Sequence, residues 1–89
     1  MIVAMKRDKT IFDASYRALI EELALERKRL NISQDELAQL IGVKQPDISK
    51  IEKFERRLDV LEFALILKAL RVSENKRLQS ISKSFLGIG

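Results

Sequence analysis

The side chains of this sequence that could take part in chemistry are hydroxyls, carboxylates, amides and cations, because the chain contains neither cysteine nor histidine. That composition excludes a disulfide framework and a zinc site, and it removes the two most versatile catalytic side chains. Serines such as Ser15, Ser33 and Ser49 have no histidine to act as a partner base, so none is a candidate nucleophile. We therefore expect a protein that is not an enzyme, that uses no metal or cofactor, and that acts through hydrogen bonds and charge.

The balance of charge is the second chemical feature of the chain. Seventeen lysines and arginines against 13 aspartates and glutamates give a net charge of +4, which favours a polyanionic partner without identifying one. No run approaches the ~18 apolar residues of a membrane span. The apolar residues 1–5 are followed at once by the charged residues 6–9, unlike a secretory signal. These features predict a cytoplasmic protein with no membrane partner.

The elements that must position these side chains are predicted to be helices. Hydrophobic residues make up 46% of the chain and charged residues 34%, as in a globular domain, and three glycines and one proline leave little material for β-turns. The 89 residues suffice for one compact all-α domain of four to five helices. We expect a mobile lead-in over 1–12, the main domain over 13–73 and a C-terminal tail over 74–89.

The first helix is predicted from Asp13, its N-cap, to about Arg29, with a break at Asn31 and Ile32. Its inner face repeats at three- and four-residue steps. This face consists of Tyr16, Leu19, Ile20, Leu23, Ala24, Arg27 and Leu30. Arg27 therefore points inward and requires a partner of opposite charge.

A second, short helix is predicted over 34–41. Ser33 and Glu36 form a capping box at its start, in which each side chain accepts from the other residue's backbone N–H. Gly42 suits the left-handed position just after its end.

A third helix is predicted over 46–53. Pro46 suits its first position and disfavours a helical conformation for Gln45, which makes Gln45 the expected N-cap. Two short helices joined by a glycine-containing turn are the layout of a helix-turn-helix. The small and apolar residues that such a motif buries are present at Ala38, Val43 and Ile48.

A fourth helix is predicted to follow Asp59, with Glu62 completing a second capping box. Its expected core stripe consists of Val60, Phe63, Ala64, Leu67 and Leu70. Further apolar residues on this helix and on the tail exceed what the core requires, and they predict a homodimer interface. They are Leu61, Leu65, Ile66, Leu78, Ile81 and Phe85. The spacing in the tail is compatible with a fifth short helix.

The sequence from residue 32 to 52, ISQDELAQLIGVKQPDISKIE, resembles the lambda-repressor/Cro (Xre-type) helix-turn-helix family. The matching pattern is Ser-Gln-x-Glu-Leu-Ala, then Gly-Val, then Ile-Ser-x-Ile-Glu at fixed spacing. The run ERRLDVLEF at 55–63 also resembles a subgroup of small stand-alone regulators, and the resemblance covers about residues 16–73. It implies a lambda-repressor-like DNA-binding domain.

The resemblance also implies roles for individual residues. Gln34 is similar to the family glutamine that hydrogen-bonds a DNA phosphate, and Gln45 and Lys50 correspond to positions that read base edges. Arg27 and Glu52 resemble the pair that links the first helix to the recognition helix. Further residues facing the DNA would be Ser49 and the phosphate-binding cations Lys44, Lys53, Arg56 and Arg57.

Three residues depart from the family pattern. Pro46 stands where the family often has a polar base-contacting residue, so its contact can only be apolar, for instance with a thymine methyl. Asp47 must either accept from a cytosine amine or be held by Lys44 or Lys50. Phe54 replaces a frequent glycine, and a left-handed turn without glycine is costly, so either the helix runs on or Phe54 anchors a surface.

These observations favour a sequence-specific transcriptional regulator of prokaryotic or phage type, acting as a homodimeric repressor that occupies a two-fold operator. One alternative is the antitoxin of a toxin–antitoxin pair, which binds its own operator and a toxin. Another is a protein-binding module that uses the fold without reading DNA. Gln34, Gln45 and the basic flank argue against that module, which has no need of them, although each glutamine can also serve only to begin a helix.

Overall fold

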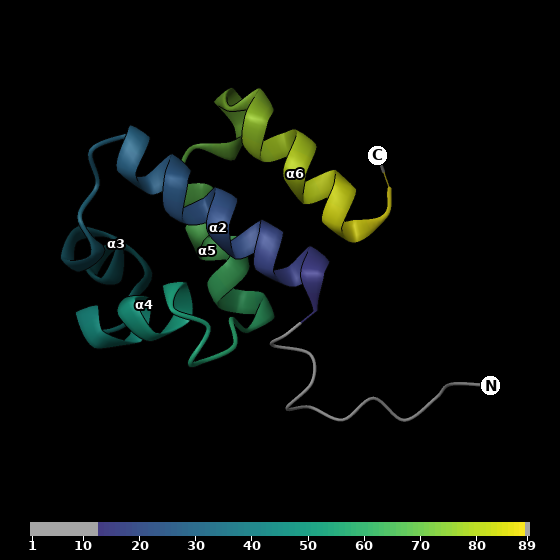
Figure 1. Cartoon of the computed structure of the whole chain (residues 1–89). Helices are drawn as coiled ribbons and strands as arrows, with labels where there is room; N and C mark the ends of the chain where they lie inside the picture. The colour runs from purple at the N-terminus through teal and green to yellow at the C-terminus, as the bar shows by residue number, and fades with distance from the viewer. Residues whose placement is uncertain (1–12, 89) are drawn as a thin grey trace.

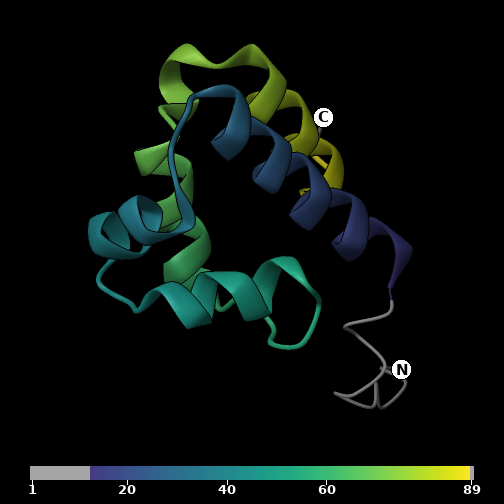
Figure 2. The same cartoon turned by 60° about the vertical axis from the view of Figure 1, so that its left-hand side comes forward.

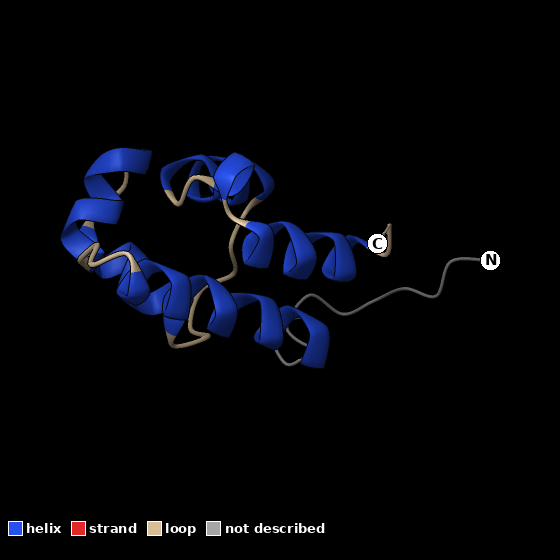
Figure 3. Ribbon diagram, turned by 90° about the horizontal axis from the view of Figure 1, so that it is seen from above, coloured by secondary structure: helices blue, strands red, loops and turns tan. Residues whose placement is uncertain are grey.

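The computed structural model describes residues 13–88, and this part of the chain consists of helices and the turns between them, as Figure 3 shows. The elements follow one another along the chain in Figure 1. They are α2 (Ala14–Arg29), α3 (Gln34–Ile41), α4 (Gln45–Glu52), α5 (Val60–Ala69), the 3-10 turn η1 (Val72–Glu74) and α6 (Lys76–Leu86). The predicted all-α class is confirmed, and the tail forms the fifth α-helix. The predicted lead-in over 1–12 lies outside the described residues.

The helices pack around one apolar core. α6 lies along α2 and runs in the opposite direction (Figure 1), while α3 packs on both α4 and α5. α4 lies at the bottom of Figure 2, away from α6, and contacts α2. The buried apolar residues come from all five α-helices and their ends. They are Leu19, Ile20, Leu23, Leu37, Ala38, Ile41, Ile48, Ile51, Ile66, Leu70 and Leu78.

α2 begins and ends where the sequence predicts. The Asp13 carboxylate accepts from the backbone N–H of Tyr16 at 3.0 Å, which caps the start. Asn31 takes the left-handed conformation at the end, with φ 58. The N–H of Ile32 then donates to the carbonyl of Arg27 at 3.0 Å, as in a Schellman motif.

α3 also has its predicted limits. The Ser33 hydroxyl accepts from the N–H of Glu36 at 3.0 Å, and the Glu36 carboxylate accepts from the N–H of Ser33 at 2.9 Å. Gly42 follows with φ 80, which favours glycine because a side chain there is strained. The turn brings Val43 back onto α3, where its N–H donates to the carbonyl of Ala38 at 2.9 Å.

α4 begins one residue earlier than predicted. Its N-cap is Lys44, so Gln45 and Pro46 occupy the first two helical positions, and the prediction of Gln45 as the N-cap is wrong. The cause is Asp47, whose carboxylate accepts from the backbone N–H of Lys44 at 3.1 Å and closes the cap from within the helix. Proline is tolerated at the second position because the N–H groups of a first turn have no partner inside the helix.

α4 ends at a left-handed residue that is not glycine. Phe54 has φ 63, so the helix does not run on. The N–H of Phe54 donates to the carbonyl of Ile51 at 3.1 Å, and that of Glu55 donates to the carbonyl of Lys50 at 2.8 Å. The half-buried ring packs against the core, and the guanidinium of Arg17 lies 4.4 Å from its centre. These contacts offset the ~1–2 kcal/mol that a left-handed conformation costs.

α5 has the predicted capping box but a different buried face. Asp59 accepts from the N–H of Glu62 at 2.7 Å. Val60 and Ala64, expected in the core stripe, are exposed. The buried face consists of Glu62, Ile66 and Leu70. The prediction is confirmed for Leu70, which is buried, and for Phe63 and Leu67, which pack against the core. It is wrong for the other two because Glu62 occupies an inward position, where Arg56 balances its charge, and a hydrophobic pattern does not reveal such a position.

Two of the predicted interface residues belong to the core of the single chain. Ile66 is 4% exposed and Leu78 is 0% exposed, so neither is available to a partner, and that part of the prediction is wrong. Leu61 is 65% exposed. The half-buried residues that pack against the core are Leu65, Ile81 and Phe85.

Candidate nucleic-acid interface

The outer side of α4 carries the residues predicted to read bases. Gln45, Pro46 and Lys50 are exposed, while Asp47 and Ser49 are half-buried. The residues beneath them are the buried Ile48 and Ile51. α4 therefore presents polar and cationic side chains outward from an apolar base.

Three of the four predicted flanking cations are exposed around this face. Lys44 precedes α4, and Lys53 and Arg57 follow it. Lys44 is the N-cap of α4 and Lys53 is its C-cap. Arg57 lies in the loop between α4 and α5. Their charges make the two ends of α4 basic, which suits contact with a phosphate backbone on either side of a groove.

Arg56, the fourth predicted cation, is half-buried and paired with carboxylates of the same chain. Its two terminal nitrogens donate to the two carboxylate oxygens of Glu62, each at 2.8 Å. Its Nε lies 4.0 Å from Asp47 Oδ1. The hydrogen bonds with Glu62 raise the pKa of Arg56, and those with Arg56 lower the pKa of Glu62. Arg56 thus links Asp47, near the start of α4, to Glu62, near the start of α5.

The carboxylate of Asp47 interacts with two groups that the sequence did not indicate as its partners. One oxygen accepts from the backbone N–H of Lys44, and the other faces Arg56. The prediction was either a cytosine amine or the side chain of Lys44 or Lys50, and within the chain the partners are instead a backbone group and an arginine. Asp47 therefore shapes the start of α4, and its charge is partly balanced there.

Arg27 and Glu52 form the predicted ion pair between α2 and α4. Arg27 Nε donates to Glu52 Oε2 at 2.7 Å, and Nη2 donates to Oε1 at 2.9 Å. The remaining terminal nitrogen donates to the carbonyl of Ile32 at 2.7 Å. Their side chains are only 8% and 15% exposed. The pair therefore fixes α4 on α2 in a nearly buried setting.

The pair extends to both predicted glutamines. Gln34 Nε2 donates to Glu52 Oε1 at 2.9 Å. Gln45 Nε2 in turn donates to Gln34 Oε1 at 2.8 Å. A continuous chain of hydrogen bonds thus runs from Arg27 in α2 to the exposed start of α4. The sequence indicated the four residues but not this link, because helix spacing does not say which side-chain ends meet across a turn.

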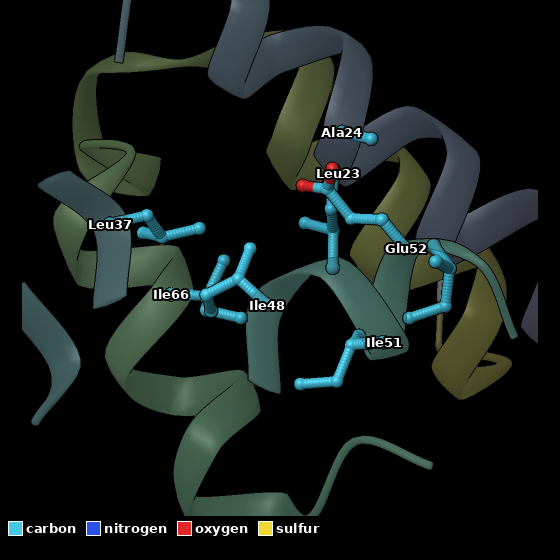
Figure 4. A pocket seen from close by; sticks show the side chains of 8 residues that line it. Leu23, Ala24, Leu37, Ile48, Ile51, Glu52 and Ile66 are labelled. Carbon is cyan, nitrogen blue, oxygen red and sulfur yellow. The ribbon is translucent and has the colours of Figure 1, made fainter. Parts of the chain in front are cut away.

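Glu52 also lines a small internal cavity, seen in Figure 4, where its carboxylate reaches from α4 toward α2. The cavity measures about 10 Å³, at the lower limit for one water molecule. Its other lining residues are Ile20, Leu23, Ala24, Leu37, Ile48, Ile51 and Ile66. An apolar void of this size is a packing gap and has no room for a ligand.

The sequence analysis missed a second buried charge next to Arg27. Glu26 is 2% exposed and accepts two hydrogen bonds from Arg29 and one, at 2.7 Å, from Asn75 at the start of α6. The hydrogen bonds from Arg29 and Asn75 lower the pKa of Glu26 from 4.5 to about 2, against the effect of burial. Glu26 follows Leu23, a residue of the predicted inner face, by three positions, and this spacing could have predicted its burial.

Two other kinds of feature are absent from residues 13–88. Within this range no cluster of three or more histidine, cysteine, aspartate or glutamate residues could hold a metal ion. No helix of the same range is both long and apolar enough to cross a membrane.

Comparison with known proteins identifies a family model and a relative that match parts of this chain. Residues 23–76 match a family model described as helix-turn-helix. A 36-residue segment is 58% identical to a protein of Haemophilus influenzae described as an uncharacterized HTH-type transcriptional regulator. The match covers 40% of this chain and 37% of that relative. The chain thus accounts for little more than a third of the relative's length.

Proposed function

The chain belongs to the helix-turn-helix family, of the lambda-repressor/Cro type that its sequence resembles, and from this premise we propose that it binds double-stranded DNA in a sequence-specific manner as a transcriptional regulator. The observation that carries the proposal is the outer face of α4, where Gln45 and Lys50 are exposed between basic ends. A helix of this kind fits a major groove ~12 Å wide, in which base edges are accessible.

Each residue of the face has a part in the proposed complex. Gln45 contacts adenine, to which an amide can bond through both its N–H and its oxygen, and Lys50 donates to guanine. Pro46 contacts a thymine methyl, and the half-buried Ser49 lies on the same face. Gln34 binds a phosphate. The proposed phosphate-binding cations are Lys44, Lys53 and Arg57.

We further propose that the protein acts as a homodimeric repressor. Two-fold operators place two recognition helices about one DNA turn, ~34 Å, apart. An exposed apolar area around Leu61 supports a second copy as the partner. Next to it an apolar groove of about 240 Å³ is bordered by Val60, Phe63, Phe85 and Leu86, and Val60 is 84% exposed. A dimer bound across a promoter would block transcription.

Selection of bound duplexes from random DNA, followed by footprinting, tests the function. We expect one preferred sequence with two half-sites. The double variant Gln45→Ala/Lys50→Ala should lose this preference, whereas Lys83→Ala, which removes an exposed lysine from α6, should keep it. Binding without any sequence preference, or no binding at low salt, would contradict the proposal and favour a non-specific or a protein-binding role.

Sedimentation equilibrium tests the homodimer. The wild-type chain should be a dimer at high concentration or on its operator, and Leu61→Lys should shift it toward the monomer. Lys28→Ala, which removes an exposed lysine from α2, is the control. A wild type that stays monomeric under both conditions contradicts the dimer but leaves DNA binding intact.

A further inference from the structure

The hydrogen bonds between α2 and the start of α4 converge on the carboxylate of Glu52. Arg27 is a donor only, and a carboxylate is an acceptor only. Glu52 accepts from Arg27 through both oxygens, and Glu52 Oε1 also accepts from Gln34. The end of Gln34 that faces Glu52 must therefore be its NH₂ group.

The orientation of Gln34 also determines the orientation of the Gln45 amide. Because the NH₂ group of Gln34 is directed at Glu52, its carbonyl oxygen faces the other way and accepts from Gln45 Nε2 at 2.8 Å. An amide carbonyl oxygen has no hydrogen to donate, so the NH₂ end of Gln45 is held toward Gln34. The amide orientation at the exposed start of α4 thus follows from a carboxylate that accepts hydrogen bonds at the other end of the same helix.

We propose that Glu52 is a positioning residue for base recognition: through Gln34 it sets the orientation of the Gln45 amide and so determines which base Gln45 accepts. The inference depends on the proposed contact between Gln45 and a base. Glu52 itself, with a side chain only 15% exposed, lies beneath the surface and acts through its neighbour.

The orientation matters because bases differ in the order of their donors and acceptors. With one N–H given to Gln34, Gln45 retains one N–H and its oxygen. Adenine offers the matching acceptor N7 and donor N6 side by side, whereas guanine offers two acceptors, N7 and O6. A fixed amide can therefore bond adenine in only one direction along the groove. A good pair of this kind discriminates between bases by about 5- to 150-fold.

The test compares two variants that both disturb the ion pair. Glu52→Gln gives residue 52 an N–H as well as an oxygen, so it no longer fixes Gln34. Arg27→Lys weakens the pair but leaves the carboxylate as an acceptor. The base pair read by Gln45 is first identified as the position at which Gln45→Ala loses its preference on the selected operator. Binding to that operator and to its three variants at this position is then measured by fluorescence anisotropy, and folding is monitored by circular dichroism.

We expect Glu52→Gln to lose the adenine preference at this position by tenfold or more while other positions stay selective, and Arg27→Lys to be less stable but equally selective. An unchanged preference in Glu52→Gln, or an equal loss in both variants, overturns the proposal. If Glu52→Gln does not fold, Gln34→Met removes the same link without touching the ion pair, and a retained adenine preference in that variant overturns it as well. A wild type without base preference contradicts the proposed function instead.

Discussion

Glu26 should make the stability of the domain depend on pH, and Glu26→Gln tests this. The carboxylate is 2% exposed, and its hydrogen bonds from Arg29 and Asn75 hold its pKa at about 2 in place of 4.5. A folded-state pKa below the unfolded one stabilises the fold above the unfolded pKa, and this stabilisation is lost as pH falls toward the folded value. Each unit by which the pKa is lowered adds ~1.4 kcal/mol to the free energy of unfolding at neutral pH. The lowering of the Glu26 pKa therefore contributes about 3 kcal/mol.

The assay is urea unfolding of the wild type and of Glu26→Gln at pH 7, 5 and 3, followed by circular dichroism. Glutamine has nearly the same shape but cannot ionise, so the variant should be less stable by about 3 kcal/mol at pH 7 and by roughly half that at pH 3. The other carboxylates titrate in both proteins and largely cancel from the difference. A difference that is the same at all three pH values would show that Glu26 stabilises the fold by shape alone and would refute the reasoning.

Three further predictions address the site and the turns. Arg27→Met or Glu52→Leu alone should cost ~3–5 kcal/mol of unfolding free energy because each leaves a nearly buried charge unpaired; the double variant should recover much of this, and additive losses would contradict it. Gln45→Ala should cost ~1–3 kcal/mol on the preferred site only, while Lys53→Ala should weaken binding to every duplex and reduce the salt slope by about one unit. Titrations at several salt concentrations separate the two effects. Gly42→Ala should lower stability by ~1–2 kcal/mol through its φ of +80 alone, since an added Cβ meets no atom within 4 Å; an unchanged melting temperature would contradict this.

Local rules predicted the parts of the fold that depend on neighbouring residues. The capping boxes at Ser33 and Asp59 and the left-handed Gly42 all appear, because each is determined within one helical turn. The start of α4 was one residue off because Pro46 fits both of the first two positions, and the cap from Asp47 decided between them.

The errors arose where a carboxylate is buried by contacts outside its own helix. Glu62 was not expected inside α5 because its burial depends on Arg56, which lies in the loop before that helix. Glu26 was missed because its hydrogen bonds are completed by Asn75, at the start of α6 and 49 positions away. Arg27 was predicted correctly because the family resemblance supplied its partner, and the inward spacing alone would not have identified Glu52.

The two buried charges of α2 are consecutive residues of opposite sign that serve different neighbours, Glu26 toward α6 and Arg27 toward α4. Successive residues of a helix point about 100° apart. A helix turned by one residue in one direction would bring Glu26 to Glu52, and a helix turned the other way would bring Arg27 toward Arg77, which lies 3.7 Å from Glu26. Each of these encounters joins like charges, so a rotation in either direction is penalised. Apolar side chains alone tolerate such rotations, and the order of two adjacent charges thus selects a single rotational setting of the central helix.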